Sequence, residues 1–496
     1  MKYFFRTLLV FYFMCCFIIS QAQNIKFNYT YGNMPYNYGR RIIETGDKGF
    51  MIMGNVTSNT GNSNIAMLRI DSTGLLVFQK SLGGQSLYWA NDFIRTTDKG
   101  YLIAGLTLEN PDKGYDMLLM KTDSNANIIW EKSIGGDGWD IANAVIETKD
   151  NAYLIAGLTY SYGAANENMY IVKTTSDGDT IWTKTFGGDS SDYATSLEIM
   201  FDSTYLIGGA TNSFGYGSFD GYLLNLDVNG DTLWTKTYGE DKEDIIYSIK
   251  QTPDTGFVFV GSTMSYDAVE HESWLMRYDK NGNYVWKLPE FWTIGPGDDV
   301  SYHVNIDDSA RYLITGYTTG AGNGGKELSI AVMGDFVDFK CSLTAGSFAD
   351  DAGYYASQTS DGGYIIIGEA EGLGIGIVNM YVLKFGNDCS FNPNIQHILG
   401  VDEQINENSN NKGKYYISPT CSDGIFYLHF GMDDNFEKAI IDVSDVMGRK
   451  ILTDNIASES YGKYTIDLTK EASGLYIVTV TNETKRISIK LVKNSR

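Results

Sequence analysis

Five aspartates recur at one position of a repeated sequence unit, and carboxylates in this pattern could bind a cation. Each stands seventeen residues before a glycine that ends an apolar run: Asp140, Asp192, Asp244, Asp299 and Asp351. Asn37 and Tyr88 hold the same position in the first two units. Hard cations such as calcium take several oxygen ligands, so the pattern predicts a calcium or polar-ligand site. Alternatively, each aspartate caps its own turn by accepting backbone N–H bonds.

Aromatic residues lie close to these aspartates and could stack on sugar rings. The candidates are Tyr88, Trp89, Trp139, Tyr193 and Trp292, among which we select Trp89 and Trp139 as ligand-binding residues. An aromatic ring combines a large apolar area with an electron-rich face, which suits a glycan. Packing within the fold is the alternative for each of them.

No catalytic residue can be assigned from the sequence. The histidines are His271, His303, His397 and His429, without H-E-x-x-H spacing, and no G-x-S-x-G turn is present. The Asp/Asn-Gly turns lack the glutamate that a calcium-binding loop requires at its end. Calcium bound by the five recurring aspartates, here called the aspartate ring, is therefore the only cofactor that the pattern suggests.

The N-terminus predicts export. Lys2 and Arg6 precede an apolar run over residues 8–19 that ends in small residues, with cleavage expected after Ala22. The run is shorter than the roughly 20 residues that span a bilayer, which argues against a transmembrane anchor. The formal net charge of −23 argues against nucleic acid and anionic membranes as partners, since both require a basic face.

An internal repeat organises most of the chain. A strand ending in glycine occurs seven times, and we call the final residues the landmark glycines: Gly54, Gly105, Gly157, Gly209, Gly261, Gly316 and Gly368. An aromatic residue precedes each by 27 to 30 positions: Phe27, Phe78, Trp130, Trp182, Trp234, Trp286 and Phe339. Turn residues between these landmarks predict four antiparallel strands per unit, near 140–147, 151–159, 168–174 and 178–186 in the third.

Seven four-stranded units predict a β-propeller over residues 23–397. The first aromatic strand precedes any complete unit, and the last unit lacks its own. The N-terminal strand is therefore expected to complete the seventh blade, which an open solenoid would not need. Cys341 and Cys389 fall near this closure, and we expect them to form a disulfide in the oxidising compartment.

Two propeller families resemble this unit over residues 25–390. The YLIGG-type strand with a later tryptophan is similar to kelch repeats, and segments such as DVNGDTLW are similar to the tryptophan-docking repeats of quinoprotein-type propellers. The resemblance implies a propeller but transfers no quinone site, because no matching pattern is present.

A second domain follows a polar linker at residues 398–413. Alternating apolar residues from 414 to 496 predict a small β-sandwich. This segment resembles the C-terminal sorting domain of the type IX secretion system of Bacteroidetes. The matching residues are Pro419, Gly424, Asp445, Gly448, Arg449, Gly474, Tyr476, Lys490 and Lys493. The resemblance implies handling by the type IX secretion machinery after passage through the periplasm, followed by release or attachment at the outer-membrane surface.

Three functions fit these observations. The first is a non-enzymatic secreted or surface propeller that binds a glycan or protein on its loop face. The second is a propeller enzyme acting on extracellular glycans, which would need carboxylates about 5 to 10 Å apart in a deep channel. The third is a structural or adhesive surface component. We favour the first.

Overall fold

All elements are β-strands in the part of the chain that the computed structural model describes. That part comprises residues 26–398, with gaps at 33, 59–60, 85, 109–112, 164–165, 267, 288–296, 322–324, 336–337, 374–375 and 393–394, and residues 415–493, with gaps at 419–420, 423, 431–437, 446–448, 458–462, 473 and 482–485. The predicted signal peptide, residues 399–413 of the linker, Trp292, Pro419 and Gly448 lie outside it. No helix long and apolar enough to cross a membrane occurs within the described ranges. The all-β prediction is confirmed.

Five sheets have four strands each, paired antiparallel in sequence order. Their strands are β6 (Leu87–Arg95), β7 (Tyr101–Leu108), β8 (Asp116–Thr122) and β9 (Ile128–Ile134); β10 (Asp140–Glu147), β11 (Tyr153–Thr159), β12 (Asn168–Thr174) and β13 (Thr180–Phe186); β14 (Asp192–Ile199), β15 (Tyr205–Thr211), β16 (Asp220–Leu226) and β17 (Thr232–Tyr238); β18 (Asp244–Gln251), β19 (Phe257–Thr263), β20 (Glu272–Tyr278) and β21 (Tyr284–Lys287); β22 (Asp299–Ile306), β23 (Tyr312–Thr318), β24 (Glu327–Met333) and β25 (Phe339–Ala345). The strands expected for the third unit agree with β10–β13 to within two residues at each end.

A nine-stranded sheet joins the two ends of the repeat region. Its strands are β26 (Asp351–Gln358), β27 (Tyr364–Glu371), β28 (Val378–Phe385), β2 (Tyr36–Glu44), β3 (Phe50–Thr57), β4 (Ser63–Ile70) and β5 (Leu76–Leu82), with β1 (Phe27–Tyr31) and β29 (Gln396–Ile398) beside them. The groups β2–β5 and β26–β28 meet through one residue pair, Tyr36 and Val378. β1 lies antiparallel to β28 along its whole length, as expected for an N-terminal strand that closes the last unit.

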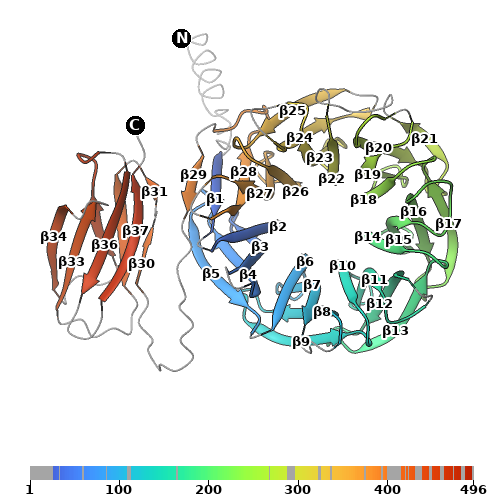
Figure 1. Cartoon of the computed structure of the whole chain (residues 1–496), viewed down its shortest axis with the longest axis horizontal. Helices are drawn as coiled ribbons and strands as arrows, with labels where there is room; N and C mark the ends of the chain where they lie inside the picture. The colour runs from blue at the N-terminus through green and yellow to red at the C-terminus, as the bar shows by residue number, and fades with distance from the viewer. Residues whose placement is uncertain are drawn as a thin grey trace, which may run out of the picture.

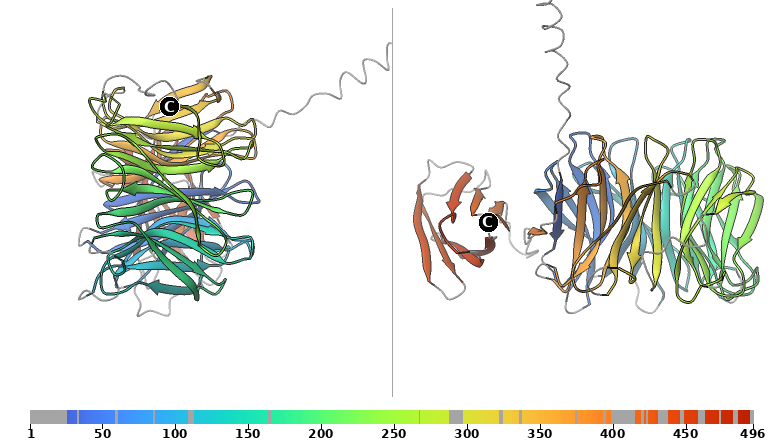
Figure 2. Two further views of the ribbon diagram at one scale, coloured as in Figure 1. Left: turned by 90° about the vertical axis from the view of Figure 1, so that its right-hand side faces the viewer. Right: turned by 90° about the horizontal axis from the view of Figure 1, so that it is seen from above.

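The four-stranded groups stand around a central opening like propeller blades (Figure 1). The first strand of each group, here called the inner strand, lines the opening, and the fourth lies at the rim. Figure 2 shows the ring from the side, with the strands running across its thickness. Each inner strand therefore reaches from one face of the ring toward the other.

Burial follows from this layering. The second and third strands of a group are buried along nearly their whole length, as in β15 and β16, whereas the rim strand β17 alternates between exposed and half-buried residues. The core lies between successive groups, where Met53 and Met67 of one pack with Phe93 and Leu118 of the next. Apolar runs in the sequence thus mark strands that are covered on both faces.

A β-bulge interrupts every inner strand opposite its landmark glycine. In β10 the register skips from Ala142 to Ala144, and Ala142 pairs with Gly157. A Cβ atom on Gly157 would lie less than 3.0 Å from the carbonyl oxygen of Ile141, and the other landmark glycines have the equivalent neighbour. The recurring glycine is therefore required by the close backbone approach at the bulge.

Two further contacts fasten the closure. Cys341 on β25 and Cys389 after β28 form the predicted disulfide. The hydroxyl of Tyr31 on β1 donates a 2.7 Å hydrogen bond to the carbonyl of Gly74 in the turn between β4 and β5. The N-terminal strand consequently contacts both groups that meet at the junction.

The C-terminal segment forms two sheets. One contains β30 (Tyr415–Ser418), β32 (Ile425–Phe430) and β35 (Lys463–Asp467), and the other β31 (Cys421–Ser422), β37 (Arg486–Lys493), β36 (Gly474–Thr481), β33 (Lys438–Asp445) and β34 (Lys450–Ala457). Phe426 and Ile466 from the first sheet share one buried core with Ile441 and Val478 from the second.

Candidate functional site

The bulges give the central channel a collar of side chains. The residue skipped at each bulge has its side chain in the channel, because a bulge re-aims the extra residue away from the sheet ladder. The collar consists of Arg40, Asn91, Asn143, Thr195, Tyr247, Tyr302 and Tyr354. All of these residues line both cavities of the channel, one of about 430 Å³ and one of about 190 Å³.

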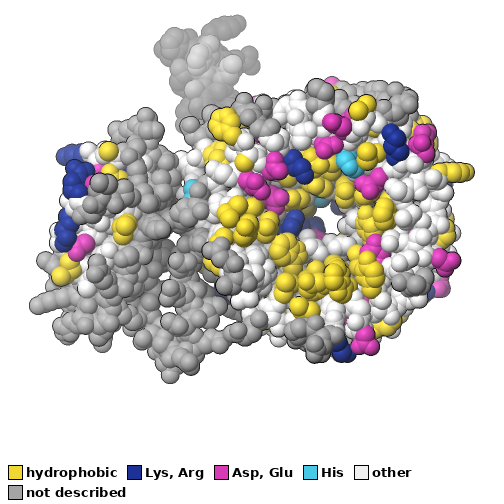
Figure 3. Space-filling model, in the orientation of Figure 1, with side chains coloured by type: hydrophobic (Ala, Val, Ile, Leu, Met, Phe, Trp, Pro, Cys, Tyr) yellow, Lys and Arg dark blue, Asp and Glu magenta, His cyan; other side chains and the backbone are white. Residues whose placement is uncertain are grey.

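One side of the collar is aromatic. The ring centroids of Tyr247 and Tyr302 are 5.3 Å apart, and those of Tyr302 and Tyr354 are 5.2 Å apart. Each tyrosine comes from a different inner strand and is only half-buried. Figure 3 shows hydrophobic side chains gathered around the central opening on the face in view. The three rings form a continuous arc that lines the channel.

The other side of the collar is polar, and its side chains form hydrogen bonds between neighbouring four-stranded groups. The side-chain nitrogen of Asn91 donates to the carbonyl of Ala142 at 2.9 Å, and that of Asn143 donates to the carbonyl of Ala194 at 2.8 Å. Thr195 repeats the contact through its hydroxyl on the next inner strand. These amides thus fix their neighbours in place while they line the channel wall.

Arg40 stands between the two sides. Its guanidinium carbon lies 4.8 Å from the centroid of the Tyr354 ring, 5.5 Å from that of Trp89 and 5.8 Å from that of Tyr38. Its buried Nε donates to no acceptor in the described part of the chain. Stacking on aromatic faces leaves the terminal in-plane donors of the guanidinium, which are not among the buried unpaired atoms, available to a ligand.

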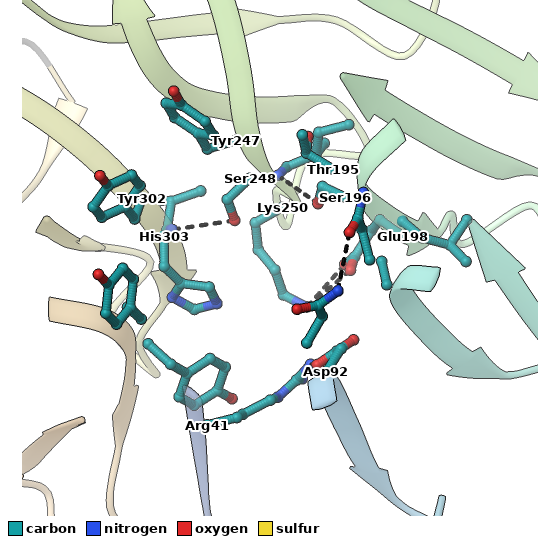
Figure 4. A pocket seen from close by; sticks show the side chains of 18 of the residues that line it. Arg41, Asp92, Thr195, Ser196, Glu198, Tyr247, Ser248, Lys250, Tyr302 and His303 are labelled. Atoms are coloured by element: carbon teal, nitrogen blue, oxygen red, sulfur yellow. Dashed lines mark hydrogen bonds and ion pairs between the residues drawn. The ribbon is translucent and has the colours of Figure 1, made fainter. Parts of the chain in front are cut away.

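A deeper layer of the channel contains paired charges (Figure 4). Arg41 forms an ion pair with Asp92, and Lys250 lies 2.9 Å from Glu198. Burial lowers the pKa of the Arg41 guanidinium, but the charge of Asp92 and their hydrogen bond outweigh burial, so the pKa is raised. Each of the two carboxylates is therefore paired with a cation in this layer.

His303 belongs to the same layer. Its Nδ1 accepts a 3.4 Å hydrogen bond from the backbone N–H of Ala356, and its ring centroid lies 4.3 Å from that of Tyr355. Burial, followed by the charges of Arg41 and Lys250, lowers the pKa of His303 well below its ordinary value. The imidazole is neutral at pH 7 and is part of the wall.

The five aspartates lie three residues before the collar and are buried. Asp192 accepts hydrogen bonds from the backbone N–H of Gly188 at 2.9 Å and from the hydroxyl of Ser213 at 2.6 Å. Asp140 and Asp244 repeat this pattern in their own turns. No group of three or more acidic, histidine or cysteine side chains suited to a metal occurs in the described ranges. Calcium binding by the ring stays a prediction.

The two selected tryptophans occupy different places. Trp89 contacts Tyr38 at a centroid distance of 5.3 Å and so belongs to the surroundings of Arg40. Trp139 is 53% exposed and packs against Tyr115 and Tyr160 in the loops. Trp89 is therefore next to the collar, whereas Trp139 belongs to a separate exposed cluster.

The sequence pattern of the acidic positions does not reveal the collar. It stands fourteen residues before each landmark glycine, in the same inner strands as the aspartates. A signal was present, since a glycine recurring within an apolar strand marks close backbone approach and a bulge. The varied residue types at the collar position concealed it.

The residues selected in the C-terminal segment have structural contacts. Asp445 and Arg449 close a hairpin through two hydrogen bonds. The backbone N–H of Arg449 donates to Asp445 Oδ1 at 2.9 Å, and the backbone N–H of Asp445 donates to the carbonyl of Arg449 at 3.0 Å. The hydroxyl of Tyr476 donates to the carbonyl of Ala472 at 2.6 Å. Buried Lys493 donates to the carbonyls of Thr469 and Glu471. Gly424 holds a left-handed backbone conformation with φ +132°, and Gly474 and Lys490 lie on β36 and β37.

Residues 414–494 match the family described as secretion system C-terminal sorting domain. This segment is a type IX sorting domain, so the protein is exported and is either secreted or attached at the cell surface. No curated protein matches the chain in sequence.

Solved structures resemble the chain only distantly. The extracellular domain of a putative hybrid two-component system from B. thetaiotaomicron shares 9% identity at a TM-score of 0.42, covering 94% of this chain and 57% of that one. Puromycin hydrolase shares 9% sequence identity at a TM-score of 0.47, and the match covers 80% of this chain and 60% of that one. A thermostable family-43 glycoside hydrolase shares 12% sequence identity at a TM-score of 0.32, and the match covers 56% of this chain and 96% of that one. The chain thus spans less than two thirds of the first two proteins.

Proposed function

We propose that this protein is an exported seven-bladed β-propeller that binds a glycan in the mouth of its central channel. The collar is the observation that carries the proposal. It places an arc of three tyrosines opposite a row of polar side chains, in a cavity of about 430 Å³. Ligand sites of this size usually combine aromatic walls with a few placed polar groups, and sugars present both apolar ring faces and hydroxyls.

The proposal of seven blades treats β2–β5 as one blade and β26–β28 with β1 as another, beside the five separate four-stranded sheets, and their pairing through a single residue pair supports this division. The mature propeller spans residues 23–397, the polar linker 398–413, and the C-terminal β-sandwich 414–496. In a bacterium with a type IX system, as in Bacteroidetes, the sandwich would deliver the propeller to the outer-membrane surface or the medium, where glycans are abundant.

A glycan fits the channel better than a peptide. Peptides are commonly held through their main chain, which pairs with free N–H and C=O groups of the binding protein. Collar side chains occupy the carbonyls of Ala142, Ala194 and Ile246 along the channel wall. The wall therefore offers side chains and aromatic rings to a ligand.

Catalysis is the second candidate and receives less support. The deep cavity holds two carboxylates, Asp92 and Glu198, yet each is paired with a cation and Asp92 also accepts the N–H of Val145 at 3.0 Å. A general acid in glycan hydrolysis must release a proton to the leaving group, which a carboxylate in an ion pair is poorly placed to do.

The test is binding of neutral and acidic oligosaccharides to the mature full chain, measured by isothermal titration calorimetry. Truncating Tyr302 to alanine should weaken binding of a positive oligosaccharide about 3- to 10-fold, since one aromatic contact contributes about 0.5–1.5 kcal/mol. Tyr284→Ala is the matched control, because Tyr284 is an exposed tyrosine on the rim strand β21. Absence of any binding that depends on Tyr302 would overturn the proposal.

A further inference from the structure

Arg40 differs from the other cations of the channel in its lack of an acidic partner. Arg41 and Lys250 are each held by a carboxylate, whereas Arg40 makes no ion pair within the described ranges. Glu369, which accepts a 2.6 Å hydrogen bond from the Tyr354 hydroxyl, is not within ion-pair distance of Arg40. The smaller cavity is lined by three cations and two carboxylates, and the larger one by Arg40 and Glu167.

This excess of positive charge stands out against the net charge of −23. Most ion pairs of the repeat region join a cation to an exposed aspartate in a turn, as between Lys173 and Asp150 at 2.9 Å. Arg40 instead projects from a bulge into the channel and is half-buried, and a guanidinium partly withdrawn from solvent interacts more strongly with an anion than a fully exposed one does.

The surroundings of Arg40 select the shape of the anion. The rings of Tyr38, Trp89 and Tyr354 hold the guanidinium. Its Nε is buried, so the two terminal nitrogens, which are not among the buried unpaired atoms, form the edge on which a planar acceptor can accept two hydrogen bonds. Two parallel N–H···O bonds are the geometry in which arginine binds carboxylates. The adjacent tyrosine arc supplies the apolar contact for a sugar ring.

We propose that Arg40 binds the carboxylate of an acidic saccharide, such as a uronic acid residue, whose ring lies against Tyr302 and Tyr354. This inference rests on the proposed glycan-binding function and specifies the chemical class of its ligand. Arg40 supplies selection for charge, while the tyrosines supply contact that neutral and acidic sugars share.

The experiment compares α-1,4-linked trigalacturonic acid with its methyl ester, which has the same backbone without the charge. Calorimetry uses the mature full chain, the variants Arg40→Gln and Arg40→Lys, and the control Arg95→Gln. Arg95 lies on the inner strand β6, is exposed and is outside both cavities, so Arg95→Gln makes the same change of net charge without altering the channel.

The acid should bind the natural protein more tightly than the ester does. Arg40→Gln should weaken binding of the acid about 10- to 100-fold, as expected for loss of a charge-assisted bidentate contact, and leave the ester unchanged. Arg40→Lys should retain part of the preference, and Arg95→Gln all of it. Thermal unfolding of each variant shows whether it is folded.

Three results would overturn the inference. If both trisaccharides bind equally and Tyr302→Ala weakens both, glycan binding stands and selection for charge fails. If neither binds, while a peptide with a free C-terminal carboxylate binds through Arg40, the ligand is a peptide. If a folded Arg40→Gln protein binds the acid as well as the natural protein does, Arg40 is not the carboxylate site.

Discussion

The carbonyl oxygen of Ile141 lies where a side chain on Gly157 would have to stand. The close backbone approach belongs to the bulge that turns Asn143 into the channel, and it leaves room for glycine alone. The glycine that defines the repeat in sequence and the collar that lines the site in space are consequences of one backbone geometry.

Replacing Gly157 by alanine should therefore destabilise the propeller by about 1–3 kcal/mol, because the added methyl group meets backbone atoms that cannot move without breaking the strand pairing. Chemical denaturation measures the effect. Gly46→Ala is the control: nothing lies within 4 Å of a Cβ there, and its effect should stay within about 0.5 kcal/mol. Equal stability of the two variants would contradict the role assigned to the bulge.

Asp351 should make stability depend on pH. Burial raises its pKa to about 7, against the lowering effect of its hydrogen bonds to Ser347, whereas an unfolded aspartate titrates near 3.9. Between about pH 4 and 7 the folded state binds more protons, so stability falls as pH rises. The stability of the natural protein relative to Asp351→Asn should therefore fall from pH 5 to pH 7, by at most about 1.4 kcal/mol per pH unit. A constant difference would contradict the shift.

A variant of His397 should be measured beside that of Asp351, because His397 makes stability depend on pH in the opposite direction. Burial lowers the pKa of His397 to about 4, and its Nδ1 lies 2.7 Å from the hydroxyl of Thr30 on β1. The unfolded state therefore binds more protons between about pH 6.5 and 4, and stability is lost on acidification. His397→Asn should remove this loss of stability on acidification and leave the pH dependence caused by Asp351 unchanged.

The disulfide should contribute about 2–4 kcal/mol to stability. It joins Cys341 to Cys389 across 48 residues, which restricts the unfolded chain. The double variant with alanine at both positions should melt at a lower temperature than the oxidised protein. A reductant should lower the melting temperature of the natural protein and have no effect on the variant; equal loss in both would show that the bond is not formed.

Lys493 should support export through the stability of the sorting domain. It is buried and donates to two backbone carbonyls, those of Thr469 and Glu471, which methionine cannot do. Lys493→Met should destabilise the domain by about 1–3 kcal/mol and reduce the amount of protein in the medium or at the surface. Lys470→Met, at an exposed position, should leave secretion unchanged, as immunoblots of cell fractions would show.

The fold was more predictable than the site because the two depend on different kinds of sequence signal. Landmark glycines such as Gly157 and rim residues such as Trp182 repeat with their types preserved, since every blade needs the same backbone approach and packing. The collar has no such constraint, and Arg40, Asn91 and Tyr302 occupy equivalent positions with unrelated chemistry. Which of them faces a neighbour becomes visible only when the ring brings strands from opposite ends of the chain together.

The pairing of β1 with β28 also means that the ring can close only when the C-terminal end of the repeat region is present. A chain that stops before residue 378 leaves its first strand without a partner, and the same chain lacks the sorting domain at residues 414–494. Two independent defects thus accompany every termination before residue 378: an incomplete ring and the absence of the sorting domain. Ring closure and export thus both depend on the last quarter of the chain, so a chain that stops before it has neither.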